Sequence, residues 1–194
     1  MNRWLRFALI LTLAPASIQL TGCAAAAGAG IATGAVAATD RRTTGTFIDD
    51  EIIELKVMDR LRNEPDLWDE SHVNATSFNN IVLLSGETPS EASKTRIGQL
   101  TATIPKVRQV HNEIAIAAPS SVLARSSDTW ITGKVKTKLL TEMALDGTRV
   151  KVVTEKGVVY LMGLVTTEEA DRATDFARRT GGVQRVVRLF ELTG

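Results

Sequence analysis

The stretch VKVVTEKGVVYLMG, residues 150–163, decides the fold. Two runs rich in β-branched and aromatic residues flank the pair Lys156-Gly157, and such a pair forms a two-residue turn whose backbone tolerates positive φ. The stretch VNATSFNNIVLLSG, residues 73–86, repeats this pattern with Asn79-Asn80 at the turn. The sequence therefore predicts two antiparallel hairpins, one in each half of a repeated chain.

A helix is predicted before each hairpin. In both copies three apolar residues recur at i, i+4 and i+8, and this spacing places them on one buried stripe of a helix. The two sets lie 78 residues apart and consist of Ile53, Val57 and Leu61, and of Ile131, Val135 and Leu139.

A second helix and a last strand are predicted after each hairpin. Residues 88–91 (TPSE) indicate a capping box at Thr88 with Pro89 at the first helical position, and residues 166–169 (TTEE) indicate another box. The closing strands span residues 107–116 and 183–192. Two strands joined by a helix are most simply parallel, whereas the hairpin strands are antiparallel. Each unit is therefore predicted to be αββαβ, with a three-stranded mixed sheet packed on two helices.

The predicted fold class is α+β, with two tandem units. The units cover residues 49–117 and 128–194, and residues 118–127, marked by Pro and Ser, are predicted to link them. Each unit is small for an independent core, so we expect the two to pack on one another.

Residues 1–22 are predicted to be a secretory signal. Arg3 and Arg6 precede an apolar run of about 12 residues, which is too short to span a bilayer comfortably. Residues 20–23 (LTGC) resemble the lipobox of bacterial lipoproteins, and this resemblance implies cleavage before Cys23 and acylation of that residue. Cys23 is the only cysteine of the chain, and lipidation would account for a thiol that cannot form an internal disulfide.

The segment that follows Cys23 is predicted to be a tether. Residues 23–48 are rich in Ala, Gly and Thr, which bury little area. An alternative for residues 24–38 is contact with lipid or with a partner. By resemblance to enterobacterial sorting rules, Ala24 favours the outer membrane over the inner one. We therefore expect a lipid-anchored protein of the outer membrane that faces the periplasm.

Composition excludes several classes of function. The net charge of +1 and the predicted export argue against nucleic-acid binding. The two histidines, His72 and His111, lie in different segments, and three convergent metal ligands cannot be assembled around them. Carboxylates near Trp68 could form a glycosidase-like pair on paper, but a solvated loop is the favoured interpretation. The sequence predicts no cofactor, no metal, no catalytic residue and no enzyme activity.

Several short motifs carry a resemblance to a known family. Residues 158–163 (VVYLMG), 181–186 (GGVQRV), 81–86 (IVLLSG) and 107–112 (VRQVHN) resemble the BON domain. Two BON units behind a lipobox resemble the DolP (YraP) family of outer-membrane lipoproteins, and residues 128–132 and 160–166 are similar to that family's second domain. The second copy departs from the pattern, because Arg188 stands where the terminal Asn is expected, at a strand position predicted to face out.

This resemblance implies a non-enzymatic protein whose BON domain binds anionic phospholipid, such as phosphatidylglycerol or cardiolipin. It also implies a role in outer-membrane integrity at the division site, with ties to β-barrel assembly.

Charge is divided unevenly between the units. Residues 49–118 hold 7 basic and 12 acidic side chains, whereas residues 125–194 hold 12 basic and 9 acidic side chains. Only the second unit, with a net charge of +3 against −5, has a sign suited to an anionic membrane.

The first helix of the second unit carries the predicted lipid-binding residues. Trp130, Lys134 and Lys138 form a stripe beside the core stripe, with Thr137 and Thr141 close by. An indole at headgroup depth with ammonium groups on phosphates suits a membrane interface. The alternative is a solvated helix face whose Trp130 packs under the linker or against the first unit.

A second function stays open at this point. The acidic first unit is suited to a protein–protein adaptor that docks on the β-barrel assembly complex or on a cell-wall amidase activator. Alternatively, its acidic surface meets the second unit.

Overall fold

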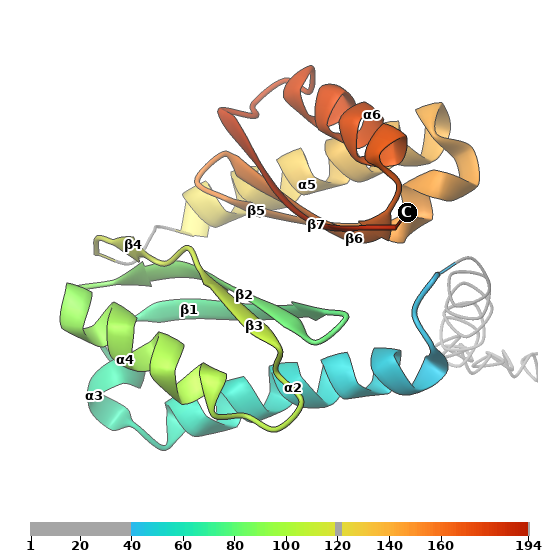
Figure 1. The fold of residues 1–194 in the computed structure, drawn as a ribbon. Coiled ribbons are helices and arrows are strands. Elements are labelled where there is room, and N and C mark those ends of the chain that lie inside the picture. Colours follow the sequence, from blue (N-terminus) through green and yellow to red (C-terminus); the bar gives the residue numbers. More distant parts are fainter. Residues whose placement is uncertain (1–39, 119–121, 194) are drawn as a thin grey trace, which may run out of the picture. The chain divides into compact units, whose positions relative to one another are not determined.

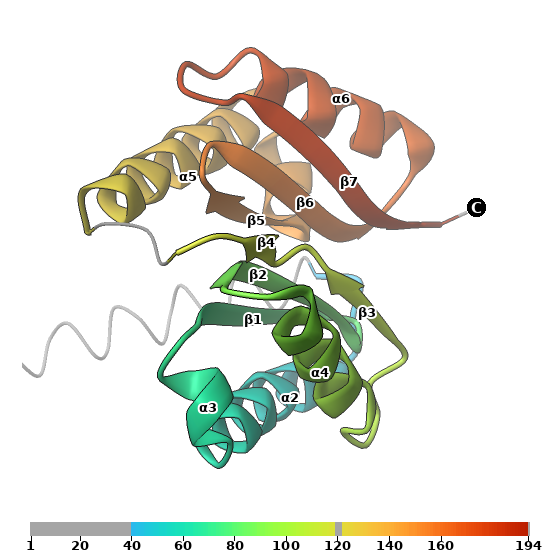
Figure 2. The same ribbon diagram turned by 90° about the vertical axis from the view of Figure 1, so that its left-hand side faces the viewer.

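The structure, a computed structural model, describes residues 40–118 and 122–193 (Figures 1 and 2). Two α+β domains follow one another along this part of the chain, which confirms the predicted fold class. Among the described helices, none is long and apolar enough to cross a membrane. Cys23 and the predicted signal lie outside the described residues.

The first domain contains a mixed sheet with helices on one face (Figure 1). β1 pairs antiparallel with β2, and β3 and β4 both pair parallel with β2, so the predicted last strand is present but interrupted. The predicted stripe of Ile53, Val57 and Leu61 is buried in the core. The elements in chain order are α2 (Thr44–Arg62), α3 (Pro65–Trp68), β1 (His72–Phe78), β2 (Ile81–Thr88), α4 (Glu91–Ala102), β3 (Gln109–Asn112) and β4 (Ala115–Ile116).

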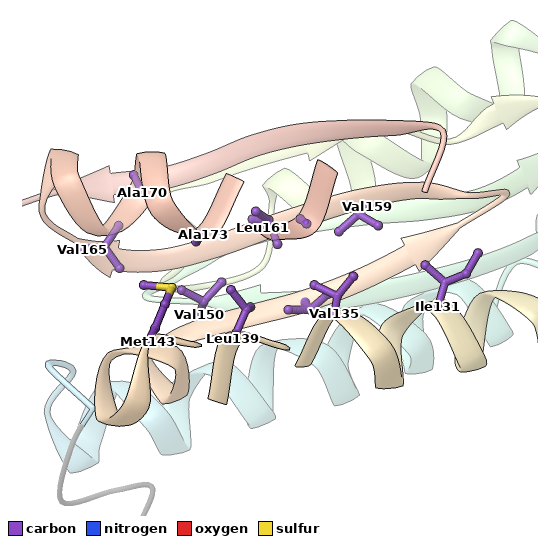
Figure 3. Packing of buried hydrophobic residues seen from close by; sticks show 12 residues of the cluster. Ile131, Val135, Leu139, Met143, Val150, Val159, Leu161, Val165, Ala170 and Ala173 are labelled. Carbon is purple, nitrogen blue, oxygen red and sulfur yellow. The ribbon is translucent and has the colours of Figure 1, made fainter. Parts of the chain in front are cut away.

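The second domain repeats this arrangement. Its sheet has the order β5-β6-β7, with an antiparallel hairpin and a parallel last strand. Figure 3 shows Ile131, Val135 and Leu139 directed from the first helix toward the strands. Alanines of the last helix pack on the same core. The elements are α5 (Val122–Glu142), the 3-10 helix η1 (Ala144–Arg149), β5 (Val150–Glu155), β6 (Val158–Val165), α6 (Thr167–Arg178) and β7 (Arg185–Leu192).

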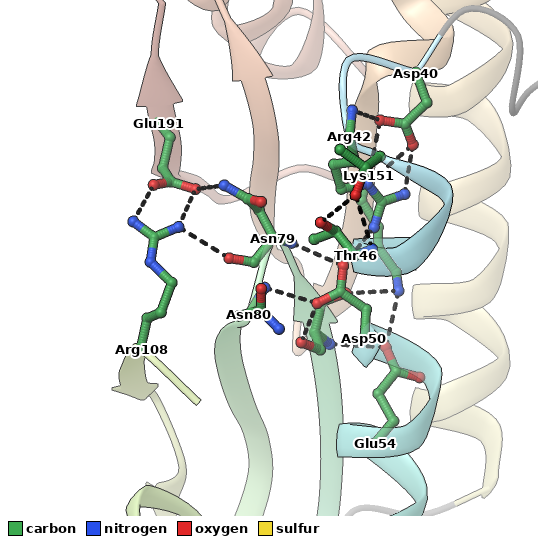
Figure 4. Close-up of polar contacts among 12 residues, drawn as sticks. Asp40, Arg42, Thr46, Asp50, Glu54, Asn79, Asn80, Arg108, Lys151 and Glu191 are labelled. Carbon is green, nitrogen blue, oxygen red and sulfur yellow. Dashed lines mark hydrogen bonds and ion pairs between the residues drawn. The ribbon is translucent and has the colours of Figure 1, made fainter. Parts of the chain in front are cut away.

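A buried aspartate on α2 holds the first hairpin turn (Figure 4). The Asp50 carboxylate accepts hydrogen bonds from the backbone N–H groups of Asn79 at 2.8 Å and Asn80 at 2.7 Å. Both asparagines have positive φ, 52° and 63°, which confirms the predicted two-residue turn. The Ser77 hydroxyl also donates to Asp50, at 2.6 Å.

Asp128 of α5 plays the same part in the second domain. Its two carboxylate oxygens accept the N–H groups of Lys156 and Gly157, each at 2.8 Å. These turn residues have φ values of 49° and 73°, so the second predicted turn is also confirmed. Asp50 and Asp128 lie 78 residues apart, at the same offset as the two core stripes. The helix-to-turn bond is therefore a repeated part of the fold.

The predicted start of α4 is wrong. Ser90 is the N-cap, its hydroxyl accepts the N–H of Ser93 at 3.1 Å, and the helix begins at Glu91 rather than at Pro89. Thr88 stays in β2, where its carbonyl accepts the N–H of Ala117. In the second domain the predicted capping box of Thr166 and Glu169 is confirmed.

The two first helices extend into segments predicted from composition as tether and linker. α2 begins at Thr44, inside the predicted tether, and α5 begins at Val122, inside the predicted linker. Small and polar residues bury little area by themselves, but they are compatible with a helix that core residues further along already hold in place.

The two domains contact one another, as their small size leads one to expect. Phe78, Ile81 and Leu83 of the first sheet form one buried cluster with Tyr160 and Met162 of the second. Ion pairs accompany this contact: Lys151 with Glu54 at 2.9 Å, Lys156 with the fully buried Glu87 at 3.0 Å, and Arg108 with Glu191 at 2.8 Å.

Candidate functional site

Helix α5 brings the predicted lipid-binding residues to the surface. Its core stripe is buried, so the neighbouring stripe one residue away turns outward. Trp130 is 70% exposed, which is unusual for an indole and argues against its packing inside the protein. The alternative in which Trp130 packs under the linker or against the first unit is therefore wrong.

All five predicted residues line one groove of about 460 Å³. They are Trp130, Lys134, Thr137, Lys138 and Thr141. The opposite wall consists of Thr180 and Gly181, from the loop between α6 and β7, and Gly133 completes the lining. Sequence reasoning missed these three residues, although the glycine pair at 181–182 was already visible as a motif.

Both lysines lean toward the loop between α6 and β7. The ammonium of Lys138 donates to the carbonyl of Arg179 at 3.0 Å, and that of Lys134 donates to the carbonyl of Gly181. An ammonium carries three donors, so one carbonyl bond leaves donors for an anion such as a phosphate. The carbonyls thus hold the two cations at the rim of the groove.

The two threonines contribute in a different way. Thr137 donates its hydroxyl to the carbonyl of Gly133 at 2.9 Å, and Thr141 donates to the carbonyl of Thr137 at 3.0 Å. These hydroxyl protons are satisfied within the helix. The groove between the lysines and Trp130 therefore demands few hydrogen bonds from an occupant, and an apolar chain can lie in it.

The equivalent stripe of the first domain differs. Arg60 bonds to the end of α4 much as Lys138 bonds to the end of α6, because its guanidinium donates to the carbonyl of Leu100 at 3.0 Å and to Thr103. Ile52 takes the position that the tryptophan occupies in the second domain. The first domain thus lacks the combination of an exposed indole and two rim cations at this stripe.

The other candidates stay apart from one another. His72 lies on β1 and His111 on β3, and within residues 40–118 and 122–193 no group of three His, Cys, Asp or Glu side chains could hold a metal ion. Trp68 packs under Arg62, whose guanidinium carbon lies 5.2 Å from the ring centre.

The strand position of Arg188 and Asn112 was predicted to face out, and this is wrong. The Asn112 amide donates to the carbonyl of Lys94 on α4 at 2.8 Å, and Arg188 pairs with Asp171 on α6 at 2.8 Å. Both side chains therefore point to the helix layer. A long arginine reaches the rim of that layer, so it can replace the amide.

Comparison with known proteins gives consistent results. The BON domain model matches residues 49–118 and 127–194. The chain is 39% identical to outer membrane lipoprotein DolP of Haemophilus influenzae, over 91% of each chain. It is 35% identical to a 21 kDa hemolysin of Actinobacillus pleuropneumoniae over 77% of each chain. It is 30% identical to osmotically-inducible protein Y of Escherichia coli, over 73% of this chain and 72% of that protein.

These matches agree with the two αββαβ domains described above, and they place the chain in the bacterial envelope, at the outer membrane. The chain therefore belongs to the BON-domain family, within the DolP group of outer-membrane lipoproteins.

Proposed function

We propose that the chain is anchored in the outer membrane through Cys23, faces the periplasm, and binds anionic phospholipid through its second BON domain. The observation that carries this proposal is the α5 groove, where the exposed Trp130 lies beside the ammonium groups of Lys134 and Lys138. An interfacial indole and two cations complement the glycerol region and the phosphates of phosphatidylglycerol or cardiolipin.

The proposed lipid anchor at Cys23 limits the role that lipid binding by the α5 groove can have. Acyl chains on one residue already hold a protein on a membrane, since each buried CH₂ contributes roughly 0.8 kcal/mol. The groove is therefore not needed for attachment. Its role is to select membrane regions rich in anionic lipid, and by this selection the protein supports outer-membrane integrity at the division site.

Vesicle binding of the mature chain without its lipid tests the groove. We expect residues 24–194 to co-sediment with phosphatidylglycerol vesicles and not with phosphatidylcholine vesicles, and Trp130→Glu to abolish this binding. Trp68→Glu is the matched control, because it makes the same change at the exposed tryptophan of the first domain. Equal binding by Trp130→Glu and the unchanged protein would overturn the assignment of the surface.

Two further measurements test the anchor and the biological role. Cys23→Ser is expected to move the protein from the membrane fraction to the soluble periplasmic fraction. In cells that lack the chain, the Trp130→Glu variant is expected to be exported and anchored normally but not to restore resistance to vancomycin, a drug that an intact outer membrane excludes. Full restoration of vancomycin resistance by this variant would show that lipid binding by the groove is not needed for envelope integrity.

A second candidate function is that of an adaptor on the β-barrel assembly complex or on an amidase activator. The net charge of −5 on the first domain favours it, because that sign suits a protein partner rather than an anionic membrane. This function predicts that a partner is retained by Trp130→Glu and released by charge changes in the first domain.

A further inference from the structure

Helix α2 exposes an apolar stripe on the side opposite to its core. Ile48 is 52% exposed, Ile52 41% and Leu55 70%, whereas Ile53 and Val57 on the other side are buried. The spacing of four and then three residues places the three exposed side chains on one helix face. Aliphatic side chains scattered singly on a surface need no explanation, but a contiguous helix face of them indicates a contact.

The stripe has the spacing of a coiled-coil seam. With Ile52 at a heptad a position, Ile48 and Leu55 fall at successive d positions. Glu51 then occupies a g position and Lys56 an e position, and both side chains are exposed. In a parallel pair of helices, a g residue meets the e residue five positions later on the partner helix. Glu51 of one copy would therefore meet Lys56 of another, twice across a twofold axis.

We propose that α2 pairs in parallel with α2 of a second copy of this chain, through a seam of Ile48, Ile52 and Leu55. The charges beside the stripe favour a second copy in the parallel orientation. An antiparallel pair would bring Glu51 against Glu51 and Lys56 against Lys56, whereas the parallel pair places each Glu51 beside a Lys56 of the second copy. The twofold axis makes the interface the same patch on both copies.

The parallel orientation also suits two copies held in one membrane. This argument rests on the proposed anchor at Cys23. Both tethers then reach their helices from the same side, at Thr44. The seam is short, because Asp59 takes the next a position after Leu55. Three apolar residues a side bury less than the ~1,000 Å² of a stable interface, so the pair is weak in solution and forms where anchoring concentrates the chain.

Disulfide trapping in the anchored, full-length protein tests the orientation. Cys23 is consumed by the lipid, so an introduced cysteine is the only thiol in the chain. We expect Ile48→Cys, Ile52→Cys and Leu55→Cys each to form disulfide-linked dimers in proteoliposomes, because a and d residues face their counterparts in a parallel pair. Gln99→Cys, at an exposed site on α4, reports random collision.

Exchanging the charges of Glu51 and Lys56 tests how the two helices recognise one another, because these variants leave the apolar seam unchanged. With the reporter Ile52→Cys, Glu51→Lys alone and Lys56→Glu alone are each expected to lower the dimer fraction, by about tenfold in the association constant. The double variant restores it. Mixing the two single variants in one vesicle is expected to give the heterodimer, since each copy then carries the charges that the other lacks.

Several results would overturn the proposal. Disulfide formation at Ile52→Cys but not at Ile48→Cys or Leu55→Cys would indicate an antiparallel pair. Dimer fractions no higher than that of Gln99→Cys would indicate random collision. Dimer fractions unchanged by the charge exchanges would show that Glu51 and Lys56 do not direct the pairing. Burial of Leu55 in lipid, seen as quenching of a fluorophore at that position by brominated acyl chains, would assign the stripe to the membrane instead. None of these results bears on the α5 groove, so the two proposals fail independently.

Discussion

Arg41 holds Glu169 at the start of helix α6, although 128 residues separate the two in the sequence. The guanidinium donates to both carboxylate oxygens, at 2.6 and 2.9 Å, and Arg149 donates to the same carboxylate at 2.7 Å. Burial by itself would raise the pKa of Glu169, but hydrogen bonds from Arg41, from the N–H of Thr166 and from Arg149 hold that pKa below its ordinary value. The segment before α2 is thus fastened to the second domain.

Removing this arginine is expected to destabilise the protein. Arg41→Ala should lower the free energy of unfolding by about 1–2 kcal/mol at pH 7, because it removes a bidentate ion pair but leaves Arg149 on Glu169. A carboxylate with a lowered pKa contributes stability above its unfolded pKa and loses it as the pH falls through the folded value. Urea unfolding should therefore show a difference that shrinks below pH 4. Arg178→Ala, at an exposed site on the same domain, is the control.

The aspartates that hold the hairpin turns are expected to be among the most sensitive polar positions. Asp128→Ala leaves the N–H groups of Lys156 and Gly157 without their acceptor beneath the helix, and should lower the free energy of unfolding by about 2–3 kcal/mol. Thermal unfolding of this variant should be compared with that of Asp175→Ala, an exposed aspartate on α6. An equal loss in both variants would mean that the turn does not depend on the helix.

Sequence alone predicted the repeated αββαβ order, because the stripes of Ile53 and Ile131 and the turns at 79–80 and 156–157 are local patterns. It also placed the five residues of the α5 groove on one surface. Asp50 and Asp128 could have been found by the same offset of 78 residues. They were missed because an aspartate near a helix start is common, and its burial depends on a turn 29 residues away.

The remaining features depend on contacts between distant segments. The carbonyls that hold Lys134 and Lys138 come from a loop more than 40 residues later, and no helical pattern contains them. The N-cap of α4 was misplaced because Thr88 and Ser90 both suit a cap, and only the strand pairing of Thr88 decides between them.

Glu155 should make stability depend on pH in the opposite direction to Glu169. Burial, with the nearby carboxylates of Glu87 and Asp128, raises the pKa of Glu155 to about 7. The folded protein therefore keeps a proton that the unfolded chain loses, and stability falls as the pH rises from about 4.5 to 7. Glu155→Gln mimics the protonated form, so it should be more stable than the unchanged protein at pH 8, by about 1 kcal/mol, and equal to it at pH 4. Denaturant unfolding at both pH values checks this, and a variant that is less stable at pH 8 would contradict it.

The three lysines of helix α5 should contribute unequally to lipid binding. Lys134→Gln and Lys138→Gln are each expected to weaken binding to phosphatidylglycerol vesicles about fivefold, since a basic residue near the surface contributes about 1 kcal/mol. Lys136→Gln, on the same helix but outside the groove, should have a smaller effect that disappears at high salt, because only long-range attraction remains. Vesicle titration at low and high salt measures both. Equal effects of Lys136 and Lys138 would indicate diffuse attraction rather than a site.

Asp59 should limit the length of the α2 seam. It follows Leu55 by four residues on the same helix face and is exposed, so a parallel pair would bring two Asp59 carboxylates together. Asp59→Leu removes this repulsion and adds a fourth apolar residue to each helix, and it should raise the association constant at least tenfold in proteoliposomes carrying the Ile52→Cys reporter. Glu91→Leu is the control for nonspecific hydrophobic association, because it makes a similar change at an exposed acidic site on α4. If both variants increase trapping alike, the added apolar surface acts without register, and α2 carries no specific pairing.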